Sequence, residues 1–219
     1  MPYSIAPESR DELTFVNFRN KLTHTTGARA MRNWLKILCL GLAAGPMMAV
    51  AIEEPSFELL DTVEEVELRQ YAPTIQARTP MQVDDSSSSG FKRLAGYIFG
   101  GNAQEQSIAM TAPVEQSMAA ADAYMAFTMP SEHAMAELPA PNDSNVSLHE
   151  VPARTVAAIS FSGWATGGKV EKMTRELMRT LEANGIETVG PPSLNQYNPP
   201  WTPPWMRRNE VVVEIAPRD

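Results

Sequence analysis

The sequence is poor in the residues that build most metal and redox sites. It has a single cysteine, Cys39, and three histidines, His24, His133 and His149, in 219 residues. One cysteine excludes an intrachain disulfide and the CxxC arrangements of zinc and redox proteins. A metal site made of several histidines would need nearly all three. The composition therefore predicts neither a zinc protein nor a disulfide-stabilised one.

Positive charge is also scarce. The chain has 18 lysines and arginines against 26 aspartates and glutamates, which gives a formal net charge of -8. A nucleic-acid binder needs a basic face that neutralises phosphates and releases counterions, so we expect no nucleic-acid partner. Hydrophobic residues make up 43% of the chain. That share is sufficient for the core of one globular domain, or at most two small ones.

No hydrophobic run reaches the length of a typical membrane span. The longest extends from Ile37 to Ala51 and is interrupted by Gly45-Pro46, whereas a span needs about 18 or more apolar residues. Basic residues follow Met31, and Ala49-Val50-Ala51 closes the run with small side chains. This layout is typical of a secretory signal peptide. The alternatives are an uncleaved anchor, a buried core helix, or an apolar hairpin in a cytosolic protein.

These features divide the chain into three parts. Met31 is the expected initiator, which makes residues 1–30 a mis-annotated or disordered extension and residues 31–51 the signal peptide. Residues 52–219 are then the mature domain, which contains no cysteine. The expected location is the periplasm or the cell exterior. An uncleaved signal segment is the only membrane contact that we expect.

Two helices and eight strands are predicted in the mature domain. Apolar residues recur at helical spacing over residues 87–99 and 168–183. Strands are predicted over residues 57–60, 66–71, 74–81, 123–129, 146–151, 155–162, 194–197 and 210–215. Each half of the domain thus contains four strands and one helix, with residues 139–143 as the linker. We expect one barrel core shared by both halves.

Four ordered motifs resemble those of the SOUL family of haem-binding proteins. They are VELRQYAP (66–73), FKRLAGYIFGGN (91–102), IAMTAPV (108–114) and YNPPWTPP with RRNEV (197–211). The resemblance spans about residues 57–215. It implies an α+β fold, a distorted antiparallel eight-stranded β-barrel of two βαββ repeats with two flanking helices. A similar barrel occurs in the effector-binding domains of bacterial regulators.

The resemblance also implies that the chain binds haem or free porphyrin in an apolar cleft beside the first helix. The vertebrate protein that gave the family its name has a histidine in the early strand motif, proposed as the axial ligand. This chain has Gln70 there, and an amide is a poor ligand for haem iron. We interpret His133 and His149 as solvated or hydrogen-bonded. Binding is therefore expected to depend mainly on apolar burial and propionate pairing, with iron ligation secondary.

The candidate ligand-binding residues surround the first helix. Lys92 and Arg93 are candidates for propionate pairing, Tyr97 for stacking on the porphyrin, and the remaining candidates are Leu94, Ile98, Met110 and Trp201. Simpler alternatives exist for each role. The two basic residues can belong to a solvated helix face, Tyr97 and Met110 to the core, and Trp201 to a stiff loop that covers the barrel.

No catalytic motif accompanies these candidates. The sequence has no GxSxG, P-loop or HExxH, and Gly100-Gly101-Asn102 follows a helix instead of opening one, which favours a helix cap over a phosphate loop. The favoured function is an exported, non-catalytic binding protein for haem or a related tetrapyrrole. The alternatives are a binding module for another hydrophobic small molecule and a haem-modifying enzyme of the dechelatase type.

Overall fold

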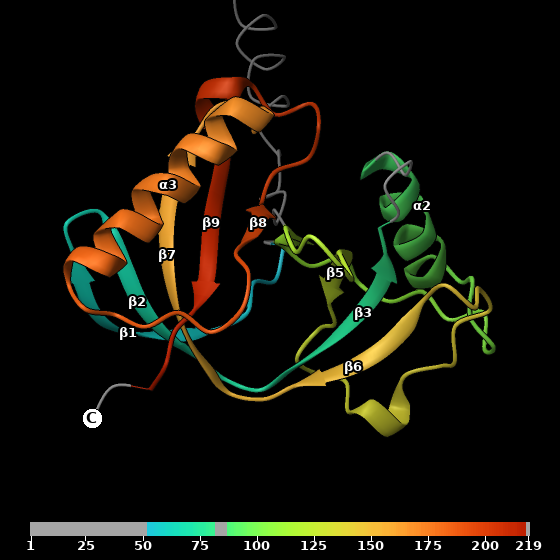
Figure 1. The fold of residues 1–219 in the computed structure, drawn as a ribbon. Coiled ribbons are helices and arrows are strands. Elements are labelled where there is room, and N and C mark those ends of the chain that lie inside the picture. The colour runs from blue at the N-terminus through green and yellow to red at the C-terminus, as the bar shows by residue number, and fades with distance from the viewer. Residues whose placement is uncertain (1–51, 82–86, 218–219) are drawn as a thin grey trace, which may run out of the picture. The chain divides into compact units, whose positions relative to one another are not determined.

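A single antiparallel sheet of nine strands organises the fold (Figure 1). The strands run in the spatial order β1-β2-β7-β9-β8-β4-β5-β3-β6, so β1 and β6 form its edges. Their bounds are β1 Phe57–Val63, β2 Val66–Tyr71, β3 Thr74–Pro80, β4 Val114–Ser117, β5 Tyr124–Thr128, β6 Ser147–Val151, β7 Arg154–Ser162, β8 Ser193–Gln196 and β9 Arg208–Glu214.

The computed structural model describes residues 52–81 and 87–217. All of them belong to the second of the two units into which the chain divides, Met1–Ala49 and Val50–Asp219. The predicted signal peptide and the extension before it lie outside the described residues. Within the described ranges, no helix is long and apolar enough to cross a membrane.

Two α-helices lie on the sheet, α2 (Ser87–Ile98) and α3 (Gly167–Ala183), and two short 3-10 turns are η1 (Met135–Glu137) and η2 (Pro204–Met206). The α-helices match their predicted ranges to within one residue at each end. At the end of α2, Gly100 has a φ of +99°, and the Gly101 N–H donates to the Gly96 carbonyl. A Cβ on Gly101 would lie 2.5 Å from that oxygen. This segment is therefore the predicted helix cap.

The predicted architecture is confirmed as a curled antiparallel half-barrel with two helices. The sheet has nine strands, one more than the eight expected. The additional strand is β4, which contains four residues and pairs with β5 and β8. It joins the strands under α2 to those under α3, so the sheet is continuous through it.

Every second side chain of the strands faces the helices, where two separate hydrophobic clusters form. One cluster contains Leu68 of β2, Ile159 of β7 and Leu177 of α3, and the other contains Leu94 of α2 and Phe127 of β5. Our expectation of one shared core was wrong on this point. The two helices cover different parts of the same sheet face, so each part has a core of its own.

The two sequence halves nevertheless interlock. Strand β2 of the first half pairs with β7 of the second, β3 pairs with β6, and β4 pairs with β8. Both hydrophobic clusters also draw on both halves, since Leu68 packs in the cluster of Ile159, and Ala77 in the cluster of Val146. Neither half therefore holds a complete sheet or a complete core.

Candidate ligand-binding site

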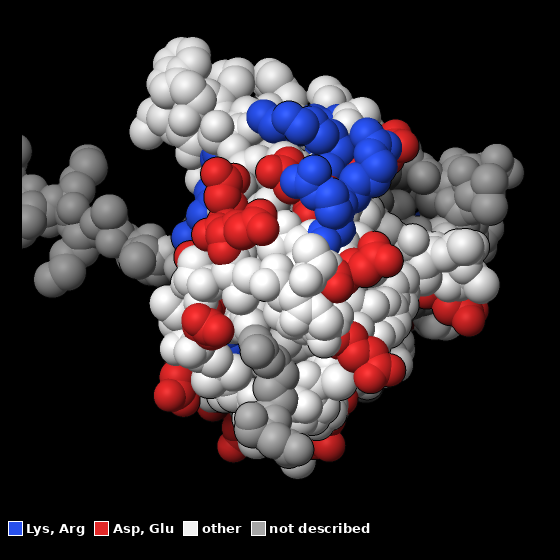
Figure 2. All heavy atoms as spheres, turned by 60° about the vertical axis from the view of Figure 1, so that its left-hand side comes forward, with Lys and Arg blue, Asp and Glu red and all other residues white. Residues whose placement is uncertain are grey.

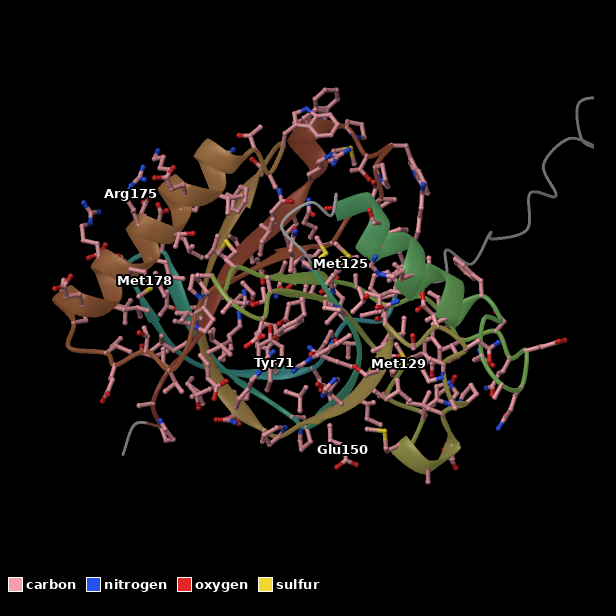
Figure 3. All side chains as sticks on the ribbon, turned by 45° about the vertical axis from the view of Figure 1, so that its right-hand side comes forward. Tyr71, Met125, Met129, Glu150, Arg175 and Met178 are labelled. Atoms are coloured by element: carbon pink, nitrogen blue, oxygen red, sulfur yellow. The ribbon has the colours of Figure 1, made fainter. Side chains whose placement is uncertain are left out.

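The sheet face turned away from the helices is polar. In β2, Glu67, Arg69 and Tyr71 alternate with the core residues Val66 and Leu68 and so point to this face. Figure 3 shows Tyr71 within the curve of the sheet. The strand registers place further polar residues on the same face, namely Arg154, Glu210, Asn195 and Glu115. We call this the concave face.

Arg69 and Glu210 form the centre of one polar cluster on the concave face. Two hydrogen bonds join them, from Arg69 Nη1 to Glu210 Oε2 at 2.9 Å and from Nη2 to Oε1 at 3.2 Å. Arg69 also donates to Glu67 and to the Tyr71 hydroxyl, and the Tyr197 hydroxyl donates to Glu210 at 2.7 Å. Both charged side chains are almost fully buried. A buried pair with so many partners holds this part of the sheet in one arrangement.

The ionisation of this cluster follows from its burial and its partners. Burial alone would raise the pKa of Glu210, but hydrogen bonds from Arg69 and Tyr197 and the positive charge of Arg69 outweigh it and hold that pKa below 4.5. Burial, followed by the nearby Glu210 charge, raises the pKa of Tyr197 above its ordinary value of 10.0. The carboxylate is therefore ionised and the phenol neutral at neutral pH.

A second polar cluster surrounds Glu115 of β4. Its carboxylate accepts hydrogen bonds from Gln76 Nε2 at 3.1 Å, from the Tyr124 hydroxyl at 2.9 Å and from Arg154 Nη2 at 3.4 Å. Burial and the charge of Glu115 raise the pKa of Tyr124 to about 12. Glu115 is thus a buried carboxylate whose partners come from three other strands, β3, β5 and β7.

Three adjacent cavities follow the concave face to one end of the sheet. The largest has a volume of about 840 Å³ and shares Ala72 and Thr128 with a cavity of about 30 Å³. That small cavity shares Glu115 and Arg154 with a third one of about 340 Å³. Asn195 lines the small cavity, and its Oδ1 atom is buried without a hydrogen-bond partner. The small cavity has room for about one water molecule, which would satisfy this acceptor.

The largest cavity lies where the ends of β3, β5 and β6 meet the η1 loop and the segment before β1. Most of its walls are apolar, and they comprise Pro55, Ala72, Pro73, Ile75, Met129, Pro130, Ala134, Met135, Val151 and Pro152. A hydrogen bond joins two distant segments of this wall, since the Ser131 N–H donates to Glu53 Oε1 at 2.8 Å. Sequence reasoning missed this cavity, since its walls come from well-separated segments.

The carboxylates that line the largest cavity give it acidic character, beside five serines and threonines. Glu53, Glu54 and Glu150 line it together with His133, and no lysine or arginine does so among the described residues. His133 is largely buried, and its Nε2 lies 3.7 Å from Glu132 Oε1. Figure 3 shows Met129 and Glu150 on either side of β6. In the described part of the chain, no group of three or more His, Cys, Asp or Glu side chains is placed to hold a metal ion.

The candidates predicted on α2 do not line any of these three cavities. Leu94, Tyr97 and Ile98 are fully buried in the hydrophobic cluster under α2, and the Tyr97 hydroxyl donates to the Pro139 carbonyl at 3.0 Å. Lys92 is exposed. Arg93 donates to Thr79 Oγ1 at 2.8 Å and to the Pro80 carbonyl. The structure thus brings three apolar candidates together as core and leaves the basic pair at the surface.

The other candidates lie apart from one another. Met110 is half-buried against the α2 cluster, and Trp201 is 83% exposed in the loop between β8 and β9. Gln70 accepts a hydrogen bond from Thr155 Oγ1 at 2.7 Å, so its amide is engaged with the neighbouring strand. His149 is exposed on β6, next to Ser147. Of the described histidines, His133 is therefore the one at a cavity.

The fold resembles solved structures of low sequence identity. The C-terminal domain of EcmrR aligns with a TM-score of 0.52 and 14% identity, over 69% of this chain and 96% of that domain. At this identity the likeness concerns the fold alone. It matches the half-barrel architecture described above.

The chain is similar in sequence to two named relatives and to one protein family. Heme-binding protein 2 of Mus musculus is 28% identical over 200 residues, which cover 80% of this chain and 95% of the mouse protein. Heme-binding protein 2 of Homo sapiens is 27% identical over 157 residues, which cover 65% of this chain and 76% of the human protein. The family model described as SOUL heme-binding protein matches residues 52–214.

Proposed function

Because the chain belongs to the SOUL family, we propose that it is an exported, non-catalytic protein that binds haem or a related tetrapyrrole. The names of the family and of its mouse and human relatives support a haem ligand. The lack of a catalytic motif supports binding without turnover. The buried carboxylates Glu115 and Glu210 support it too, because their hydrogen-bonding capacity is taken up by neighbouring side chains.

The observation that carries the proposal is the cavity of about 840 Å³ with mainly apolar walls. Its volume lies within the range of about 300–1,000 Å³ that small-molecule sites occupy. Pro73, Met135 and Val151 are among the side chains that would contact an apolar macrocycle there. Apolar burial is then the main driving force. Since the lining carboxylates repel propionates, the acidic edge of the ligand would point to the open mouth of the cavity.

Iron ligation is a minor contribution in this proposal. His133 is the described histidine at the cavity, and imidazole is a ligand type that haem iron accepts. Its Nε2 lies near Glu132, and Met129 is buried in the core under α2, so neither is a free ligand directed at the cavity centre. We therefore expect haem and iron-free protoporphyrin to bind with dissociation constants within about tenfold of each other.

A second placement remains the one predicted from sequence, beside α2. Phe91 and Phe99 of this region are exposed, and Lys92 and Arg93 offer positive charge for propionates. A ligand there would contact Tyr97, Leu94 and Ile98 only if α2 moved away from its cluster. Lys92→Glu combined with Arg93→Glu should weaken haem binding about tenfold if this placement holds, and leave it unchanged if the cavity holds the ligand.

A second candidate function is supported by the acidity of the cavity. Glu53, Glu54 and Glu150 line it without a lysine or arginine among the described residues, and such a lining favours a hydrophobic cation over a dicarboxylate. Absorbance titrations with haem and protoporphyrin, and a separate calorimetric titration with a hydrophobic cation that also serves as the competitor, distinguish the two functions. Tetrapyrrole binding predicts a saturable shift of the Soret band. The cation function predicts no such shift and tight binding of the competitor.

Export is supported by the basic segment after Met31, the apolar run and Ala49-Val50-Ala51. Intact-mass analysis of the protein recovered from its own host tests this part. A mature chain that begins at or near Ile52 is expected. Recovery of a cytosolic chain that retains residues 1–51 would contradict it.

A further inference from the structure

Large apolar side chains gather at one end of the molecule, around the loop between β8 and β9. Trp201 is 83% exposed, Trp205 78% and Met206 65%, and Trp164 in the turn before α3 is 55% exposed. These include three of the four tryptophans of the chain. Exposed apolar groups gathered in this way usually mark an interaction site. We call these four residues the tryptophan tip.

The tip is held in a fixed conformation by its own loop. Four prolines restrict the backbone between residues 199 and 204, and the Met206 N–H donates to the Pro203 carbonyl at 3.0 Å. Arg207 donates to the Thr202 carbonyl at 2.9 Å, while its guanidinium lies 3.8 Å from the Trp164 ring. The apolar side chains are therefore presented to solvent without a conformational change, which lowers the entropic cost of docking.

Basic residues lie next to the tip and along the neighbouring helix. Arg207 and Arg208 follow it directly in the sequence, and Arg208 is paired with Glu54. Lys169 lies in the first turn of α3, where its amine donates to the Ser162 carbonyl. Further along α3, Lys172 and Arg179 are exposed, as are the acidic Glu171 and Glu182. Figure 2 shows lysine and arginine side chains gathered on the side of the molecule that carries α3. This local positive charge contrasts with the net charge of -8 of the whole chain.

We propose that the tryptophan tip docks the protein onto an anionic lipid bilayer. Tryptophan and methionine enter the interfacial layer readily, because the indole ring has an apolar body and a polar N–H that stays among the headgroups. Arginine and lysine beside it attract anionic headgroups. Exposed tryptophans next to arginine and lysine side chains are the combination that an anionic interfacial layer attracts. This membrane contact is additional to the signal segment.

The experiment measures partition of the full chain onto vesicles of phosphatidylcholine with 30% phosphatidylglycerol, and onto phosphatidylcholine alone. Sedimentation gives the bound fraction, and tryptophan emission reports insertion. We expect the wild type to prefer the anionic vesicles at least tenfold, with a blue shift of its emission. Trp201→Ala with Trp205→Ala should reduce partition at least tenfold. Phe99→Ala is the control, because Phe99 is an aromatic residue outside the tip that is 69% exposed. This variant should partition onto the vesicles as the wild type does.

The outcomes that overturn the proposal are distinct. Equal partition of the wild type and the double variant would assign membrane binding to another segment, such as Ile37 to Ala51. Absence of wild-type binding to anionic vesicles would exclude a lipid partner. A wild-type dimer that the double variant converts to a monomer would identify the tip as an interface between two copies. Trp201→Ala alone, with an expected loss of about threefold, repeats the test with a smaller perturbation.

Discussion

Arg69 and Glu210 form a buried, two-point ion pair although they lie on strands β2 and β9, which β7 separates in the sheet. The pair therefore spans three strands and joins the first strand motif of the chain to the last. Both residues come from segments that resemble the SOUL family, VELRQYAP and RRNEV. The pair joins β2 to β9 across the concave face on which the three cavities lie.

Replacing one partner of this ion pair should lower the free energy of unfolding. Arg69→Met leaves Glu210 buried without its cation, and such a change typically costs about 3–5 kcal/mol. Replacing both residues by methionine should recover most of that loss, because no unpaired charge remains. Urea unfolding measures both variants. Arg175→Ala is the matched control, since its pair with Glu171 is exposed and should contribute less than about 0.5 kcal/mol. A cost below about 1 kcal/mol for Arg69→Met would show that water reaches Glu210.

The free energy of unfolding should decrease at acidic pH, and this decrease should depend on Glu210. Its pKa in the folded state lies below the ordinary value of 4.5, so the folded state holds its proton less tightly than the unfolded state. The resulting stability is fully present above pH 4.5 and is lost as the pH falls through the folded pKa. Urea unfolding from pH 7 to pH 3 measures this decrease. Glu210→Gln should flatten the slope below pH 4.5, and an unchanged slope would contradict the assignment.

The free energy of unfolding should also decrease at alkaline pH, and this decrease should depend on Tyr124. Its pKa rises from 10.0 to about 12 in the folded state, so the folded state keeps the phenol proton while the unfolded state loses it. This contribution is present below pH 10 and is lost as the pH rises toward 12. Tyr124→Phe should reduce the loss of stability between pH 10 and pH 12 by about 1–2 kcal/mol. Absorbance titration of the folded protein gives an independent test, since a phenol that ionises near pH 10 would exclude the raised pKa.

Neither half of the mature domain should fold alone. Residues 52–139 contain β1 to β5 and α2, but lack β6 and β7, which pair with β3 and β2. Residues 142–219 lack those partners in turn. Each fragment would expose unpaired strand edges and part of a hydrophobic cluster. Circular dichroism of the separate fragments should show no cooperative thermal transition, whereas a mixture should regain one. A cooperative transition from one fragment would contradict the interlocked arrangement.

The sequence predicted both helices closely because their apolar residues repeat at helical spacing and glycines follow them. It did not reveal β4, since Glu115 and Ser117 are polar yet buried, so the alternation of apolar and polar residues that marks a half-buried strand is absent. The same property misled the interpretation of β2. Arg69 alternates with Val66 and Leu68 as a residue on a solvated face would, but the curled sheet encloses that face and Arg69 is buried. The alternation of polar and apolar residues in a sequence does not distinguish a solvent-exposed face from a buried polar cluster.

The candidate site was less predictable than the fold. Tyr97, Leu94 and Ile98 have the periodicity of a helix face, and periodicity alone does not separate a ligand cleft from a packed core. The largest cavity depends on Pro55, Ala72 and His133, among other residues, which lie on loops that are distant in the sequence. Their meeting is a consequence of strand order and loop conformation. No local sequence motif predicts that these loops meet.

The most direct test of the account is a haem titration of a variant in which the largest cavity is filled. Ala72 lines that cavity and the small one beside it, so Ala72→Trp should occupy the space of the ligand. Ala136 lies on η1 outside the cavity lining, and Ala136→Trp is the matched control. We predict that Ala72→Trp weakens the binding of haem and protoporphyrin at least tenfold, while Ala136→Trp leaves both within twofold of the wild type. Unchanged haem binding by a folded Ala72→Trp variant would contradict the account.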